Sequence, residues 1–222
     1  GGDYYDCFLV GVDQVVMCMA DVSGKGVGAA ILMSNFQANV RAIFNSGSRS
    51  LIEKVKELNT RVMASAQGEK FITFFVAVYD KKSNSLEYVN CGHNPPLWID
   101  AQGNSFLLEL GAVGLGMFKE LPTIVSGNVE VHSGSTLICY TDGLVEQENE
   151  KSEEFGMTRL EEIVRQGKDM TIDAVRIGLG VGFIAVAIGT WIAWGNAYAA
   201  VSLCVLLYSS LALIFAPKDI TS

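Results

Sequence analysis

Apolar and polar residues follow two different periods along residues 1–166. Residues 8–20 alternate as two short strands would, on either side of a Gly-Val-Asp turn. Residues 28–44 carry apolar side chains every three or four positions, which predicts a long buried helix. Residues 51–66 repeat that period with a charged face, which predicts an amphipathic helix whose charged residues, Lys54 among them, face outward.

The segments that follow have the pattern of β-hairpins. Residues 71–80 and 86–93 are strand-like and flank a polar Lys-Ser-Asn-Ser turn. A second pair of short strands is expected within residues 96–110, around Asp-Ala-Gln-Gly, and a strand at residues 135–143 ends on Asp142. Helices in one group and hairpins in another predict the α+β class, with an antiparallel β-sandwich flanked by helices rather than a parallel sheet.

A short helix is expected after Phe155, where Thr158 and Glu161 have the spacing of a capping box. This helix completes a domain that we expect over residues 1–170. A short linker, residues 171–176, would follow it.

The C-terminal segment has a different composition. Residues 177–217 contain no charged residue, and a helix that spans a membrane needs only about 20 apolar residues. Two apolar runs flank a Gly-Asn-Ala turn, with aromatic residues near the turn and a basic residue, Arg176 or Lys218, beyond each far end. The pattern predicts a transmembrane helical hairpin over residues 177–217 and a tail of residues 218–222. A pair of buried core helices, or a misassembled or frame-shifted sequence, is the alternative.

The basic flanks of this segment favour a cytoplasmic domain attached to the inner membrane by its C-terminal part. The chain of 222 residues carries a formal net charge of −8, which argues against nucleic acid as a partner, because phosphate binding needs clustered Lys and Arg. Its five cysteines form no C-x-x-C pair, so neither a disulfide framework nor a zinc site is indicated. The chain begins inside a motif, and we expect it to be a fragment of a longer protein.

The sequence "ADVSGKGVGAAILMSNF" places Asp21 at the end of a strand, before a glycine-rich turn and a helix. A Walker A loop would need Gly at position 19 and Ser or Thr after Lys25, and the chain has Met19 and Gly26 there. A dinucleotide-binding fingerprint would need a parallel strand after the helix, and none is indicated. The turn is therefore not predicted to bind phosphate directly.

Three acids instead share one setting: Asp3, Asp21 and Asp142 lie at strand ends or turns, beside glycine or another small residue. Oxygen ligands held rigidly, with room for water, are what Mg²⁺ or Mn²⁺ requires. Any one of these acids alone is most simply interpreted as a turn residue. Their recurrence favours a metal site.

Two other side chains could take part in chemistry. His93, in "NCGHNPPLW", could be a ligand or general acid, but a loop histidine that braces a turn stiffened by two prolines is the favoured interpretation. Cys91 lacks the Arg-rich phosphate loop of cysteine phosphatases, which argues against a nucleophile. His132 is expected to face solvent from a strand.

Several motifs together resemble one family. The chain is similar in motif order and spacing, over residues 1–166, to the PPM-type metal-dependent serine/threonine phosphatases, in the branch of the sporulation stage II protein E and the RsbU-like regulators of bacterial sigma factors. The motifs that carry this resemblance are "GGDYYD", "ADVSGKGVGAAILMSNFQANVRA", "FITFFVAVYD", "YVNCGHNPPLW", "GLGMF" and "LICYTDGLVEQENEKSEEFGMTRL".

The resemblance implies a β-sandwich with two metal ions, Mn²⁺ or Mg²⁺, at one end. Asp21 then resembles the carboxylate that bridges both ions, and the backbone carbonyl of Val22 resembles a ligand to one of them. Asp142 resembles a ligand to the second ion, and Asp3 the acid of the first motif, which binds a metal directly or through water.

The implied reaction is hydrolysis of phosphoserine or phosphothreonine on a regulatory protein of the anti-sigma-factor antagonist type, without a phosphoenzyme. Two cations about 3.5–4 Å apart can lower the pKa of a bridging water, aim it at phosphorus and neutralise the phosphoryl oxygens. No side-chain nucleophile is needed, and none is evident.

The chain departs from the family at both ends. The strand that precedes "GGDYYD" is missing, and the closing Asp-Asp-Ile-Thr motif, whose first Asp binds the second metal, is replaced by "KDIT". Lys218 stands at the ligand position, and Asp219 is interpreted as a residue beside the membrane. The alternative function is therefore a catalytically impaired, membrane-tethered scaffold that binds a phosphoprotein.

Overall fold

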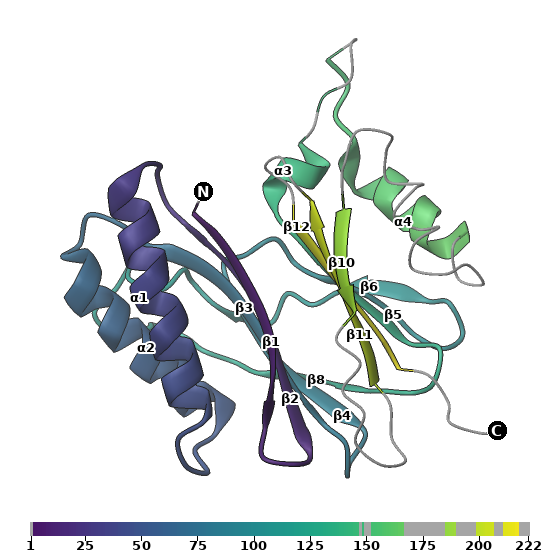
Figure 1. Ribbon diagram of the computed structural model, residues 1–222, viewed down its shortest axis with the longest axis horizontal. Helices are drawn as coiled ribbons and strands as arrows, with labels where there is room; N and C mark the ends of the chain where they lie inside the picture. The colour runs from purple at the N-terminus through teal and green to yellow at the C-terminus, as the bar shows by residue number, and fades with distance from the viewer. Residues whose placement is uncertain are drawn as a thin grey trace. The chain divides into compact units, whose positions relative to one another are not determined.

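The computed structural model describes residues 2–146, 148, 152–166, 185–189, 199–206 and 211–217 (Figure 1). The chain divides into two compact units. The first comprises Gly1–Pro95 and Leu108–Glu130, and the second comprises Pro96–Leu107 and Val131–Ser222. The expected domain boundary at residue 170 falls outside the described residues.

The first unit is built on a mainly antiparallel sheet in the order β1-β2-β3-β4-β7, with β8 also paired to β4. Its one parallel pair among the described strands is β4 with β7. Both hairpins predicted from the sequence are confirmed. The strands are β1 (Asp3–Val10), β2 (Gln14–Val22), β3 (Ile72–Asp80), β4 (Ser85–Cys91), β7 (Gly111–Ala112) and β8 (Gly127–Glu130).

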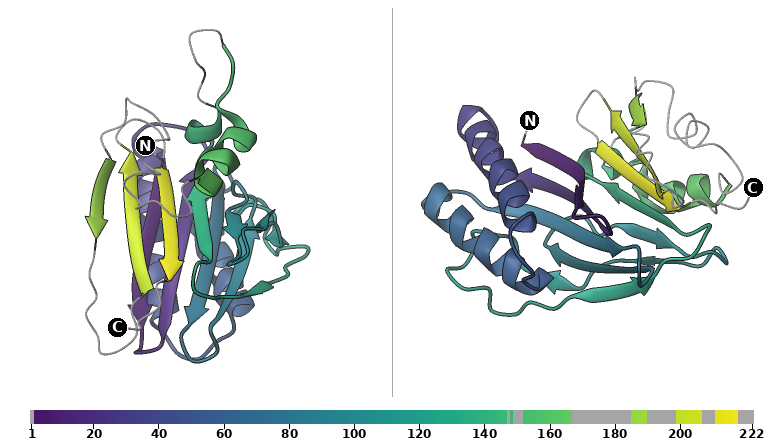
Figure 2. Two further views of the ribbon diagram at one scale, coloured as in Figure 1. Left: turned by 90° about the vertical axis from the view of Figure 1, so that its right-hand side faces the viewer. Right: turned by 60° about the horizontal axis from the view of Figure 1, so that its bottom comes forward.

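Two helices, α1 (Val27–Phe44) and α2 (Leu51–Ala66), lie along one face of this sheet in every view (Figures 1 and 2). Phe36 of α1 packs against the sheet. Its ring meets Tyr4 of β1 and Phe74 of β3 edge to face, at centroid distances of 6.3 Å and 5.0 Å. Both helices were predicted from their apolar period. Their packing leaves the opposite face of the sheet, with Asp21 at its edge, for other contacts.

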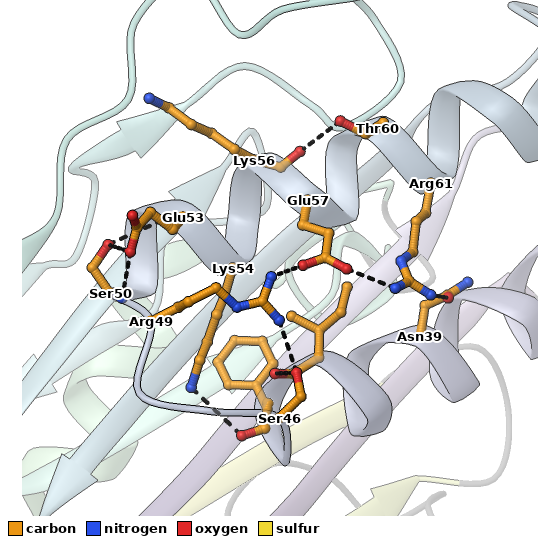
Figure 3. Close-up of polar contacts among 12 residues, drawn as sticks. Asn39, Ser46, Arg49, Ser50, Glu53, Lys54, Lys56, Glu57, Thr60 and Arg61 are labelled. Carbon is orange, nitrogen blue, oxygen red and sulfur yellow. Dashed lines mark hydrogen bonds and ion pairs between the residues drawn. The ribbon is translucent and has the colours of Figure 1, made fainter.

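Polar contacts set the start of α2 (Figure 3). Ser50 and Glu53 form a reciprocal capping box. The Glu57 carboxylate forms ion pairs with Arg49 and Arg61. Lys54 is buried instead of facing outward. Its ammonium lies 5.1 Å from the Phe44 ring centroid, and burial lowers its pKa. The prediction for Lys54 was wrong because a long aliphatic stem can pack inside while its charge meets an aromatic face.

The second unit contains an antiparallel sheet in the order β10-β11-β12-β9-β5-β6. Leu97, Ile138 and Tyr140 of this sheet pack with Leu144 and Leu160. Its elements are β5 (Leu97–Ile99), β6 (Ser105–Leu107), β9 (Thr136–Tyr140), α3 (Asp142–Val145), α4 (Gly156–Gln166), β10 (Ala185–Gly189), β11 (Ala199–Leu206) and β12 (Leu211–Pro217).

The helical hairpin predicted over residues 177–217 is wrong where the structure describes this segment, because β10, β11 and β12 are strands. An uncharged run has no polar face to mark its period, and a strand in the middle of a sheet can be apolar throughout. Among the described residues, no helix is both long and apolar enough to cross a membrane. The remainder of residues 177–217 and the tail with Lys218 and Asp219 lie outside the described residues.

The capping box predicted at Thr158 and Glu161 is also wrong. The helix α4 begins at Gly156, so both residues lie inside it. The spacing Ser/Thr-x-x-Glu recurs within helices as well as before them, and only the position of the first turn distinguishes the two cases. The α+β class itself is confirmed, since helices and antiparallel sheets form separate groups along the chain.

Candidate functional site

The hairpin of β1 and β2 brings two predicted metal ligands together. Asp3, the first residue of β1, lies directly opposite Asp21, near the end of β2. Side chains of directly opposed residues share one face of a sheet and stand about 5 Å apart at their Cβ atoms. That face is the one turned away from α1 and α2, because the neighbouring Ala20 and Val22 belong to the core beneath the helices. Two carboxylates so placed repel one another, and a cation between them would remove the repulsion.

Gly2 packs closely against the oxygens of Asp21 and Val22. A Cβ atom at position 2 would lie 2.7 Å from Asp21 Oδ1 and 2.9 Å from the Val22 carbonyl oxygen, closer than a side chain allows. Both oxygens therefore lie on the same side of the Gly2 Cα. The predicted bridging carboxylate and the predicted carbonyl ligand are thus close neighbours.

The peptide group that joins Asp21 to Val22 is held at both of its polar atoms. Its N–H, on Val22, donates to the Gly2 carbonyl oxygen at 3.2 Å. Its carbonyl oxygen, on Asp21, accepts from Thr73 Oγ1 at 3.4 Å. The orientation of this peptide is consequently set by β1 on one side and by β3 on the other.

The glycine-rich turn after Val22 is tied to the start of β3. Ser23 N donates to the Phe71 carbonyl oxygen, and Phe71 N donates to Ser23 Oγ, both at 2.9 Å. Lys70 reaches over the turn and donates from Nζ to the Ser23 carbonyl oxygen at 3.4 Å. Gly24 has a φ of 86°, which favours glycine. Sequence reasoning missed Lys70, since an isolated lysine before a strand belongs to no motif.

Asp142 is the first residue of α3, in the second unit, directly after β9 and the buried Thr141. Its Oδ1 accepts from Gly143 N at 2.7 Å, and its side chain is exposed. The predicted strand ends two residues earlier than expected, at Tyr140, so Asp142 begins α3 instead of ending β9. The first unit by itself supplies Asp3, Asp21 and the Val22 carbonyl.

These donors fit a hard divalent cation, since all of them are oxygen atoms and two of them lie beside Gly2. Within the described residues, no group of three or more His, Cys, Asp and Glu side chains is close enough to hold a metal ion. The pair of carboxylates in the first unit is therefore an incomplete ligand set that needs water, the backbone carbonyl or further acids.

His93 lies in the loop after β4, and the hydrogen bonds of the His93 backbone hold this loop in place. His93 N donates to Asn90 Oδ1 at 2.8 Å, and Asn90 Nδ2 donates back to the His93 carbonyl oxygen at 3.1 Å. The ring is buried, and its Nδ1 lies 3.0 Å from Thr73 Oγ1. These contacts agree with the bracing role that the sequence favoured for His93, and they add a link to β3 that it did not indicate.

The surroundings of the two remaining candidates, Cys91 and His132, do not suit a catalytic role. Burial raises the pKa of the Cys91 thiol to about 12, so this side chain stays neutral and is a poor nucleophile. His132 is exposed as expected, although it lies in a turn before β9 and not in a strand.

The family model of stage II sporulation protein E (SpoIIE) matches residues 11–177 of the chain, which include Asp21, Val22 and Asp142. The chain belongs to the SpoIIE family. This membership confirms the resemblance found in the motifs, that of a PPM-type phosphatase domain related to RsbU, RsbP and SpoIIE. Asp3 of the SpoIIE-family domain precedes the matched range.

Curated relatives of the SpoIIE-family domain include two bacterial proteins. Protein IcfG of Synechocystis sp. is 28% identical over 188 residues, which are 72% of this chain and 29% of IcfG. Phosphoserine phosphatase RsbU of Bacillus subtilis is 27% identical over 146 residues, 65% of this chain and 43% of RsbU. The chain spans less than half the length of these relatives.

Solved structures share the fold of the SpoIIE-family domain. The RsbU and RsbW domains of Rv1364c from Mycobacterium tuberculosis match all of this chain and 58% of that chain, at a TM-score of 0.72 and 21% identity. The PP2C phosphatase domain of SpoIIE from Bacillus subtilis matches 81% of this chain and 53% of that chain, at 0.67 and 17%. RsbX in complex with magnesium matches 80% of this chain and 78% of that chain, at 0.60 and 17%.

Proposed function

We propose that this SpoIIE-family domain is a metal-dependent protein phosphatase. Its substrate would be phosphoserine or phosphothreonine on a regulatory protein of the anti-sigma-factor antagonist type. The observation that carries the proposal is the opposition of Asp3 and Asp21, with the Val22 carbonyl oxygen and Asp21 Oδ1 both beside Gly2. The name of the relative RsbU, a phosphoserine phosphatase, supports the chemistry of the substrate.

Each predicted ligand has a separate role in this proposal. Asp21 would bridge two ions, the Val22 carbonyl would bind one of them, and Asp142 would bind the second. Asp3, exposed at the start of β1, would bind directly or through water. Mg²⁺ and Mn²⁺ accept the same oxygen donors, and the RsbX structure of the same fold was solved with magnesium.

When bound, the two ions would supply an activated water and neutralise the charge on the phosphoryl oxygens. The chain's own contribution is to hold its carboxylates in place before substrate arrives, so that no reorganisation is needed during the reaction. A side-chain nucleophile plays no part, and the buried neutral thiol of Cys91 agrees with this.

The test is Mn²⁺-dependent release of phosphate from a phosphoserine protein, and of p-nitrophenol from p-nitrophenyl phosphate, by the chain and by Asp21→Asn. We expect the substitution to lower kcat/KM about 100-fold or more, because it removes the charge that holds both ions. Asp13→Asn is the matched control. Asp13 is on the same hairpin but at its far end, where it pairs with Lys82, so this variant should keep full activity.

Two results would contradict the proposal. Equal activity in wild type and Asp21→Asn would show that the site is elsewhere. Inactivity of the wild type at saturating Mn²⁺, together with retained binding of a phosphoprotein, would favour the alternative of a catalytically impaired phosphoprotein-binding scaffold.

A further inference from the structure

We propose that Thr73 and His93 are positioning residues for the metal site, acting as one hydrogen-bonded unit that fixes the peptide group between Asp21 and Val22. This inference rests on the proposed function, since it assigns a role toward the metal that Asp21 and Val22 would bind. Neither residue is among the metal ligands that the family resemblance implies.

The peptide group between Asp21 and Val22 links the two predicted ligands. Asp21 contributes the carbonyl oxygen and Val22 the N–H of this group, so its rotation would move the Asp21 side chain and the Val22 carbonyl relative to each other. Gly2 holds the N–H side. On the other side, Thr73 lies opposite Asp21 in the ladder of β2 and β3, and its hydroxyl donates a further bond to the Asp21 carbonyl oxygen.

The next contact holds the Thr73 side chain. Thr73 Oγ1 lies 3.4 Å from the Asp21 carbonyl oxygen and 3.0 Å from His93 Nδ1, so it contacts both groups at once. A hydroxyl group can donate one hydrogen bond and also accept, and the ring nitrogen can take either part. His93 thereby keeps the Thr73 side chain beside Asp21.

The histidine is itself held from behind. Asn90, which is buried, accepts from the His93 N–H and donates to its carbonyl oxygen. The same Asn90 amide also donates to the Leu108 carbonyl oxygen at 3.3 Å. A chain of hydrogen bonds, buried at Asn90 and partly buried at Thr73, therefore runs from the end of β4 to the end of β2, where the predicted ligands lie.

A structural role alone accounts poorly for this arrangement. Valine would fill a strand position like that of Thr73 without a polar atom to satisfy. Outer contacts that orient a metal ligand typically change metal affinity 10- to 100-fold when removed. A contact that only stabilises the fold changes the unfolding midpoint and leaves the affinity of the folded protein unchanged.

The experiment is direct titration of Mn²⁺ into the folded chain by calorimetry, with free Mn²⁺ followed by electron paramagnetic resonance. Thr73→Val and His93→Leu each remove one step of the link, and we expect each to weaken Mn²⁺ binding about tenfold. Thr73→Ser keeps the hydroxyl, and His93→Asn places an amide donor near the position of Nδ1. Both conservative variants should retain affinity within about threefold of the wild type.

Tyr79→Phe is the matched control. It removes a hydroxyl from the same strand, β3, at the end far from Asp21, where Tyr79 donates to Asn84 Oδ1 at 2.9 Å. This variant should bind Mn²⁺ as the wild type does. If Thr73→Val does not fold, His93→Leu, which leaves β3 unaltered, tests the same link.

The double variant, Thr73→Val with His93→Leu, decides whether the residues act as one unit. We expect it to bind no more weakly than either single variant, because the link is already broken. Multiplied losses, or wild-type affinity in both single variants, would overturn the inference. A wild type that binds Mn²⁺ but releases no phosphate would contradict only the proposed function, whereas a wild type that binds none would overturn both.

Discussion

Single atoms decide the geometry of the candidate site, and Gly2 is the clearest case. Gly2→Ala would place a methyl group within 3 Å of the Asp21 carboxylate and the Val22 carbonyl oxygen. One of these oxygens must then move, and we expect Mn²⁺ affinity to fall about tenfold in calorimetry. Gly28→Ala is the control, since the nearest atom to its added Cβ is 3.8 Å away. Unchanged affinity in Gly2→Ala would show that these oxygens do not bind the ion.

The buried thiol of Cys91 predicts a dependence of stability on pH. Its folded pKa is about 12, above the unfolded value of about 8.5. The unfolded chain therefore loses this proton first, and stability falls as pH rises above about 8.5. Between about pH 8 and pH 10, we expect the free energy of unfolding of the wild type to fall by about 2 kcal/mol more than that of Cys91→Ala. Urea unfolding at the two pH values measures this, and parallel losses in both proteins would contradict it.

Among the elements, α2 is connected to the loop after β7 by one buried side chain. Asn59 donates to the carbonyl oxygens of Phe118 and Lys119, at 3.0 Å and 3.3 Å, and accepts from Gly116 N at 2.9 Å. Asn59→Leu would leave the buried Gly116 N–H and the two carbonyl oxygens without this partner, and we expect a loss of about 2–3 kcal/mol in urea unfolding. Asn39→Ala, in an exposed contact, should change stability by less than about 0.5 kcal/mol. Similar losses in both variants would show that the hydrogen bonds of Asn59 do not stabilise the protein.

At the scale of the whole molecule, the C-terminal strands determine how the second sheet is completed. β12 lies between β11 and β9, so Ile214 is opposite both Ser202 and Ile138. Ile214→Pro removes a ladder donor inside the sheet, and we expect a loss of at least about 2 kcal/mol. Ile188→Pro lies in β10, which among the described strands pairs with β11 alone, and should cost less. Equal losses in urea unfolding would favour the helical hairpin, where both positions are interior.

The sequence predicted the two long helices and the hairpins of the first unit, because an apolar period marks the helices and polar turns mark the ends of the strands. It did not indicate the short strands β7 and β8, and it did not show that β2 and β3 are buried at nearly every position. It failed at Lys54 and Thr158 because side-chain type and local spacing do not report where a stem packs or where a helix begins. It failed at residues 185–217 because a run without polar residues has no period from which to choose helix or strand.

For the candidate site, the sequence by itself determined the chemistry. Acids at strand ends beside small residues indicated a hard cation, and their motifs indicated the family that the comparison with SpoIIE shows. Only the tertiary structure decided which atoms meet. The opposition of Asp3 and Asp21, the close packing at Gly2 and the link from His93 through Thr73 depend on strand register and on loops far apart in the chain. Local sequence cannot encode such contacts, because they arise only when separate segments pack together.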